Sequence, residues 1–206
     1  RADGDEGPKY LNTPESPLFR KREAFYGLPE ALEAIRRSER AIIVEGYFDF
    51  AQLYQAGGLP VVATCGTALT TQQAQMLRRF VPKVVINFDP DTAGQNAAER
   101  SSELLVESGF DVNVVRLPGG DDPDAFMQKH GRDAYLAELK QSQPYLEFLL
   151  ERAARAHNLT REDSRREFLQ QMLTVAARIP DPATRDQFAD RLAHKARVTE
   201  EVVRVE

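Results

Sequence analysis

Two stretches decide the fold: Ala41-Ile42-Ile43-Val44-Glu45-Gly46 and Lys83-Val84-Val85-Ile86-Asn87-Phe88-Asp89-Pro90-Asp91. Each is a short run of apolar, mostly β-branched residues that ends in acidic residues. Similar apolar runs occur at 61–64 and 112–116, and helical patterns separate the four runs. Strands this short and apolar, with helices between them, are typical of a parallel sheet covered on both faces. The sequence therefore predicts an α/β fold with right-handed crossovers.

The chain beyond Pro144 follows helical spacing alone. We expect three helices, near 144–157, 161–179 and 182–197, with Thr160 capping the second and Asp181 the third. Their apolar positions predict a helical bundle that packs on itself. The patterns together divide the chain into a lead-in at 1–40, a sheet domain at 41–143, and a helical subdomain at 144–206 that is cut at its end.

The bulk composition narrows the class of protein. The chain has 206 residues, of which 42% are hydrophobic, enough for one core with a small helical annex. No apolar run reaches the roughly 18–20 residues of a membrane span, and no secretory leader is visible. The single Cys65 excludes an internal disulfide and a thiolate zinc site. We expect a cytoplasmic protein without a membrane partner.

Acidic residues follow three of the expected strands. They are Glu45 after 41–44, Asp89 and Asp91 after 83–88, and Asp121, Asp122 and Asp124 after 112–116 and a Pro-Gly-Gly turn. Because the carboxyl ends of parallel strands share one edge of the sheet, these groups should converge there. Gathered carboxylates suit Mg²⁺, and two such ions could assist phosphoryl transfer. The net charge of −5 argues weakly against a nucleic-acid partner unless divalent metals neutralise these acids.

Several of these acids also have a structural interpretation. Asp91 and Asp122 each precede an expected helix and could cap it, and Asp122 is followed by proline. Asp49 lies on the first turn of a helix, where an acid favours the helix dipole. Capping does not explain Glu45 or Asp89, which end strands. The cluster as a whole therefore indicates a metal site.

These motifs, in this order, resemble the Toprim domain of bacterial replicative DNA primases of the DnaG type. Topoisomerases, some nucleases and some repair proteins share that domain. The segments that carry the resemblance are 9–19, 26–28, 44–49, 89–94 and 117–124. The similarity runs from about Pro8 to Asp124, and it is weaker in the helical tail. It implies a Toprim-like α/β fold followed by a helical bundle.

The resemblance implies a nucleotidyltransferase that makes short RNA primers from nucleoside triphosphates on single-stranded DNA. It implies that Glu45, Asp89 and Asp91 are the catalytic metal ligands, for Mg²⁺ or its substitute Mn²⁺. Further acids would complete the patch, namely Asp49, Asp122 and Asp124. Expected contacts to nucleotide or nucleic acid are Lys9, Asn12, Lys21, Gly46 and Gly94; the two glycines allow a tight turn and a close approach of phosphate.

Primases of this type are longer than this chain. We expect zinc only in a domain outside it, since the chain has no zinc ligands, and we expect the replicative helicase to bind through a C-terminal domain that is absent here. The basic half of the polymerase core that holds template is also expected elsewhere. We therefore predict a monomer that binds metal at the bacterial replication fork, and that this segment alone does not make primers.

Three other interpretations stay open. In haloacid-dehalogenase-type phosphatases an Asp-x-Asp-x-Thr motif opens the fold, whereas Thr92 directly follows Asp91 here and two expected strands precede the motif. A different Toprim nuclease would use the same acids. A non-catalytic interaction module would use them only as helix caps and would bind a partner through the helical tail.

Overall fold

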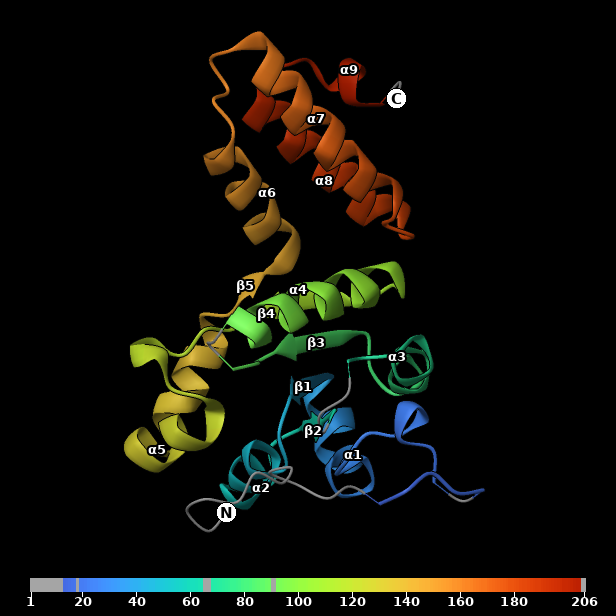
Figure 1. Cartoon of the computed structure of the whole chain (residues 1–206), viewed down its shortest axis with the longest axis vertical. Helices are drawn as coiled ribbons and strands as arrows, with labels where there is room; N and C mark the ends of the chain where they lie inside the picture. Colours follow the sequence, from blue (N-terminus) through green and yellow to red (C-terminus); the bar gives the residue numbers. More distant parts are fainter. Residues whose placement is uncertain (1–12, 18, 65–67, 90–91, 205–206) are drawn as a thin grey trace.

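The structure is a computed structural model that describes residues 13–17, 19–64, 68–89 and 92–204. Within these ranges the chain forms a five-stranded sheet in the order β2-β1-β3-β4-β5 (Figure 1). The strands are β1 Arg40–Val44, β2 Val61–Ala63, β3 Lys83–Ile86, β4 Asp111–Val114 and β5 Gln143–Pro144. The first four are parallel, which confirms the predicted α/β fold, whereas β5 was not expected and pairs antiparallel to β4.

Helices connect the parallel strands and then form the end of the chain. Those of the sheet domain are α1 Leu28–Ser38, α2 Tyr47–Gln55, α3 Thr71–Arg78, α4 Thr92–Glu107 and α5 Pro123–Lys140. Two short 3-10 turns are η1 Lys21–Glu23 and η2 Pro118–Gly120. The last group is α6 Tyr145–Ala156, α7 Glu162–Ala177, α8 Pro182–Ala196 and α9 Glu200–Arg204.

Both faces of the sheet are buried, as the apolar strands require. Along β1, Ala41 and Ile43 pack into one core with α1, α3 and α4, whereas Ile42 and Val44 pack into a second core with α2 and α5. All four side chains are at most 1% exposed. Because alternate residues of a strand point to opposite faces, a run without polar residues is what a doubly covered strand needs.

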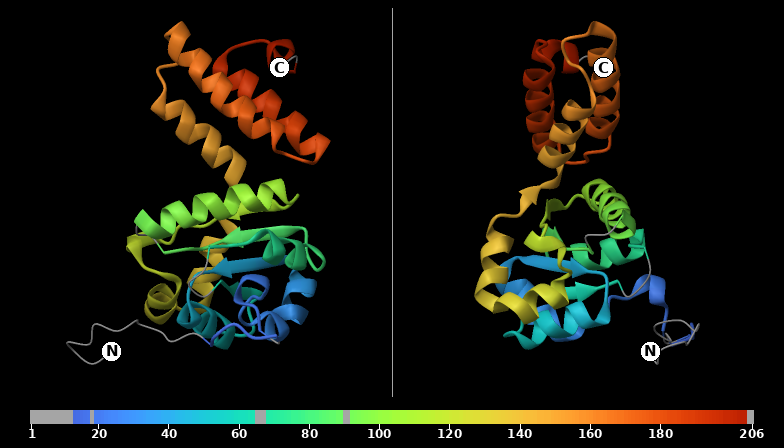
Figure 2. Two further views of the ribbon diagram at one scale, coloured as in Figure 1. Left: turned by 45° about the vertical axis from the view of Figure 1, so that its right-hand side comes forward. Right: turned by 60° about the vertical axis from the view of Figure 1, so that its left-hand side comes forward.

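Helices α6–α9 form a separate group at one end of the molecule, with α4 as the nearest helix of the sheet domain (Figure 2). Fully buried Phe168, Met172 and Leu192 form their centre, and Tyr145 and Leu149 continue that core toward the sheet. The expected bundle is thus confirmed. None of the helices in the described ranges is long and apolar enough to cross a membrane.

One of the two expected caps in the bundle is correct. Asp181 Oδ2 accepts a hydrogen bond from the Thr184 N–H at 2.7 Å and caps α8. The prediction that Thr160 caps α7 is wrong, because the helix begins one residue later and Arg161 occupies the N-cap position. The Thr160 hydroxyl instead donates to Asn158 Oδ1 at 2.6 Å, in a local turn of the kind that asparagine favours.

A buried polar pair joins α5 to the end of β3. The Tyr135 hydroxyl donates to Asn87 Oδ1 at 2.8 Å, and both residues are at most 1% exposed. Asn87 directly follows β3, and its backbone N–H donates to Ile43 O at 3.0 Å. The pair therefore fixes the segment that leads into Asp89.

Tyr135→Phe should lower the free energy of unfolding by about 1–3 kcal/mol, because Asn87 Oδ1 would stay buried without a donor. Urea denaturation measures the change. The matched control is Tyr54→Phe, which removes a hydroxyl that is half-buried and donates to Glu30 O at the longer distance of 3.3 Å. An equal loss in the two variants would contradict a structural role for the buried pair.

Candidate metal and nucleotide site

The first part of the candidate site is the turn between β1 and α2. Glu45 directly follows β1, and Gly46 is the N-cap residue of α2. Asp49, on the first turn of the helix, accepts a hydrogen bond from the Gly46 N–H through Oδ2 at 3.0 Å. Its other oxygen accepts from the Asp124 N–H at 3.2 Å, so the first turn of α2 is tied to the start of α5.

The second part joins the ends of β1 and β3. Glu45 Oε1 accepts a hydrogen bond from the Asp89 N–H at 3.3 Å. Gly94, in the first turn of α4, packs against both residues. A Cβ added there would lie 2.4 Å from Asp89 O and 2.8 Å from Glu45 Oε1, so the position has no room for a side chain. Two acids that are 44 positions apart in the sequence are thereby neighbours at one edge of the sheet.

The electrostatics of this edge are unfavourable to ionised Asp49. Burial raises the pKa of Asp49 to about 6, and the Asp89 carboxylate raises it as well. Hydrogen bonds from the backbone of Gly46 and Asp124 act in the opposite direction, and Asp122 adds a smaller repulsion. Burial and neighbouring like charges both disfavour a carboxylate, and a bound cation would reverse the second effect.

The acids that follow β4 have local partners in this structure. Asp122 Oδ1 accepts from the Ala125 N–H at 2.7 Å and caps α5, so its structural interpretation holds. Asp124 Oδ1 accepts from Gln128 Nε2 at 2.7 Å, and Asp121 forms an ion pair with Lys129. Asp122 nevertheless lies close enough to Asp49 to raise its pKa.

Of the remaining residues proposed from the sequence, the structure describes Lys21 alone. Lys9, Asn12 and Asp91 lie outside the described residues. Lys21 lies in η1, where its backbone N–H donates to Glu15 Oε1 at 3.0 Å. Among the described residues, no three histidine, cysteine or acidic side chains already form a complete ligand set for a metal ion.

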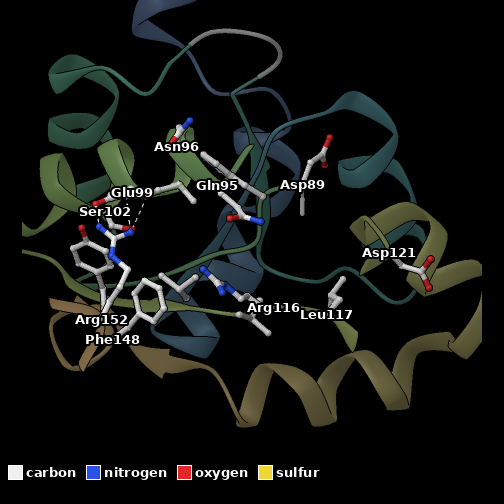
Figure 3. A pocket seen from close by; sticks show the side chains of 15 residues that line it. Asp89, Gln95, Asn96, Glu99, Ser102, Arg116, Leu117, Asp121, Phe148 and Arg152 are labelled. Atoms are coloured by element: carbon white, nitrogen blue, oxygen red, sulfur yellow. Dashed lines mark hydrogen bonds and ion pairs between the residues drawn. The ribbon is translucent and has the colours of Figure 1, made fainter. Parts of the chain in front are cut away.

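A pocket of about 210 Å³ opens beside Asp89. Figure 3 shows Gln95 and Arg116 between Asp89 on one side and Phe148 with Arg152 on the other. The Arg116 guanidinium carbon lies 4.8 Å from the centre of the Phe148 ring, and Arg152 Nη1 donates to Glu99 Oε2 at 2.8 Å. A pocket that is lined by both polar and aromatic side chains could hold a nucleotide.

Sequence reasoning missed Arg116 and Gln95 as candidate binding residues. Arg116 follows β4 as Glu45 follows β1, so the same rule about strand ends could have identified it. Gln95 carries no such signal, because its position beside the pocket depends on how α4 packs over the sheet.

Two families match the chain. Residues 42–127 match the family described as Toprim-like, and residues 146–201 match the DnaB-helicase binding domain of primase. The DNA primase of Clostridium acetobutylicum is 36% identical over 199 residues, which are 97% of this chain and 33% of that protein. The chain therefore spans about a third of the length of this relative.

Solved structures of primases superpose closely. A DNA primase domain from Pseudomonas aeruginosa has a TM-score of 0.88 at 33% identity, over 97% of this chain and 64% of that one. A DnaG primase catalytic domain bound to single-stranded DNA has a TM-score of 0.87 at 31% identity, over 96% and 64% of the two chains.

The fold and the acidic edge define a Toprim-type α/β domain followed by a helical subdomain. The matches then give the family: the chain belongs to the DnaG-type DNA primases of bacteria and corresponds to part of their catalytic core. They favour this assignment over the nuclease and phosphatase alternatives. They also correct one expectation, because a segment of the helicase-binding family lies within the chain, at 146–201, and not only outside it.

The raised pKa of Asp49 predicts a pH-dependent stability without divalent metal. The Asp49 carboxyl group stays protonated up to about pH 6 in the folded chain, whereas it loses its proton near pH 3.8 in the unfolded chain. The free energy of unfolding should therefore fall as the pH rises from about 3.8 to about 6. The loss should approach about 3 kcal/mol at neutral pH. Urea denaturation in EDTA across this range should show a flatter profile for Asp49→Asn than for the exposed control Asp133→Asn. Parallel profiles would contradict the prediction.

Gly94→Ala tests the close packing between the two strand ends. The new methyl group would overlap Asp89 O, a backbone atom that cannot turn away, and should destabilise the fold by about 1–3 kcal/mol. It should also weaken Mn²⁺ binding measured by calorimetry, because the acids would be pushed apart. Arg100→Ala, an exposed change on the same helix, is the control. Wild-type Mn²⁺ affinity in Gly94→Ala would show that this packing does not shape the site.

Proposed function

We propose that this chain supplies the metal-binding catalytic core of a DNA primase, a nucleotidyltransferase that makes short RNA primers from nucleoside triphosphates on single-stranded DNA. The observation that carries the proposal is the contact between Glu45 and the Asp89 backbone, with Asp49 held beside them. Family membership supports the reaction class, because the relatives are DNA primases. A capping role alone leaves this contact unexplained.

Mg²⁺, or Mn²⁺ in its place, fits the donor set at this edge. Carboxylate and backbone oxygens of described residues gather there, and hard divalent cations prefer such ligands. We propose Glu45, Asp89 and Asp91 as the catalytic ligands, with the neighbouring acids Asp49, Asp122 and Asp124 in support. When bound, the metal would neutralise the charge that develops on the phosphates during nucleotidyl transfer.

The chain's own residues would position the nucleotide. Gly94 leaves the first turn of α4 open to the close approach of a phosphate. Arg116 places a cation in the pocket beside Asp89, and its guanidinium group packs over the ring of Phe148. Gly46, Lys9, Asn12 and Lys21 remain proposed contacts to nucleotide or template.

The rest of the proposal concerns the whole protein. We propose a lead-in at 1–40, a Toprim domain at 41–143 and a helical subdomain at 144–206. A replicative helicase is the proposed partner of the helical subdomain, since 146–201 match a helicase-binding family. We further propose a cytoplasmic monomer that acts at the replication fork on template, nucleoside triphosphates and growing primer, with zinc bound only in another domain.

Glu45→Gln tests the proposed reaction directly. It removes one charge from the metal site while keeping the shape of the side chain. Primer synthesis by a full-length primase that contains this sequence should fall by at least roughly 100-fold, because metal coordination contributes several kcal/mol to the transition state. A primer-extension assay on single-stranded template measures the rate, and calorimetry with Mn²⁺ measures the affinity.

The matched control is Glu33→Gln, the same chemical change on the exposed face of α1, where Glu33 pairs with Arg37. The control should retain synthesis and Mn²⁺ binding. Full activity of Glu45→Gln would remove Glu45 from the proposed metal site. Loss of Mn²⁺ binding without loss of synthesis would separate the acidic edge from the reaction.

A further inference from the structure

A group of basic side chains lies at the edge of the sheet opposite to the acids. We call it the basic edge and define it as Arg36, Arg40, Arg78, Arg79 and Lys83. Strands β1 and β3 begin with Arg40 and Lys83, which are partners in the register of the sheet. Figure 1 shows this end of β3 next to α3, on the side away from α5.

Contacts between α1, α3 and the strands hold the basic edge together. The Arg36 guanidinium carbon lies 5.5 Å from the centre of the Phe80 ring, just after α3. That of Arg78 lies 5.6 Å from the ring of Phe110, the residue before β4. These ring contacts place Arg36 beside the end of α3 and Arg78 beside the start of β4.

None of these five cations forms an ion pair with a carboxylate of the described residues. Among the described residues, nine other basic side chains are in ion pairs, as Arg37 is with Glu33 and Arg178 with Glu107. Three acids lie near the basic edge, namely Glu39, Asp111 and Asp181. Asp111 is the register partner of Lys83 and Asp181 caps α8, so five cations lie near three acids and positive charge prevails at this edge in a chain of net charge −5.

Helix dipoles explain only part of this arrangement. Arg36 and Arg78 lie in the last turns of α1 and α3, where a cation is favourable. Arg40 and Lys83 begin strands, where no dipole attracts them. A groove of about 440 Å³ also runs along this edge, between Arg78, Lys83 and Phe110 on one side and the start of α8 on the other.

We propose that the basic edge binds the phosphate backbone of single-stranded DNA without divalent metal. Unpaired, exposed arginine and lysine side chains are the groups that contact phosphates in a sequence-independent way. This contact lies at the far end of the strands from the acids. It goes beyond the proposed function, on which it rests only for the choice of DNA as the polyanion.

The test measures binding of a fluorescein-labelled, single-stranded DNA of mixed sequence by anisotropy in EDTA. The variant is Arg79→Gln/Lys83→Gln, because both side chains are exposed and circular dichroism can confirm the fold. If Arg79 and Lys83 both contact phosphates, the logarithm of the association constant should depend less steeply on the logarithm of the salt concentration, with a slope shallower by about 1.4. The control is Arg155→Gln/Arg166→Gln, which removes the same charge from α6 and α7.

Four further results decide the outcome. Arg79→Lys/Lys83→Arg keeps both charges and should keep the slope. Equal slopes in the Gln variant and its control would overturn the proposal, and so would displacement of the DNA by polyglutamate as readily as by unlabelled DNA of equal charge. Glu45→Gln should bind DNA like the wild type in EDTA, so failure of the metal site and failure of the basic edge are distinguishable.

Discussion

The burial of neighbouring carboxylates at the ends of parallel strands is the constraint on which the site depends. The fold brings Glu45, Asp49 and Asp89 to one edge, where burial and mutual repulsion oppose the ionised form of Asp49. Hydrogen bonds from backbone N–H groups hold these acids in place but do not neutralise them. An arrangement of this kind lowers stability by itself, and a bound divalent cation would offset the repulsion.

The surrounding structure serves to keep that edge rigid. Gly94 allows α4 to approach Asp89, and the buried Tyr135–Asn87 pair fixes the segment that precedes it. Asp49 in turn ties the first turn of α2 to the start of α5. Segments from three separate parts of the sequence therefore determine the position of each acid, as a preorganised site requires.

The separation of charge reconciles an acidic chain with the proposed nucleic-acid partner. Net charge alone argues against phosphate binding, but the metal-site acids Glu45, Asp49 and Asp89 and the cations of the basic edge lie at opposite edges of the same sheet. This arrangement follows from topology, because each crossover helix starts at the carboxyl edge and ends at the other. Acids that follow strands and cations that end helices are thereby sorted to opposite sides.

Much of the fold and part of the site could be predicted from the sequence. Apolar runs such as 41–44 and 83–88 predict buried parallel strands, and the rule that strand ends share an edge brings Glu45 to Asp89. The two-residue strand β5 has no periodic signal. Threonine is a good capping residue, but the Thr160 hydroxyl bonds to Asn158 in a local turn and does not cap the helix. Gln95 and Phe148 reach their pocket only through the packing of α4 and α6, which residue patterns do not encode.

Anomalous diffraction from crystals soaked in Mn²⁺ tests the central claim most directly. If the acidic edge is a metal site, the anomalous map will show a peak within coordination distance of carboxylate oxygens of Glu45 and Asp89. A map without a peak there, at Mn²⁺ concentrations that occupy other sites on the same molecule, would contradict it.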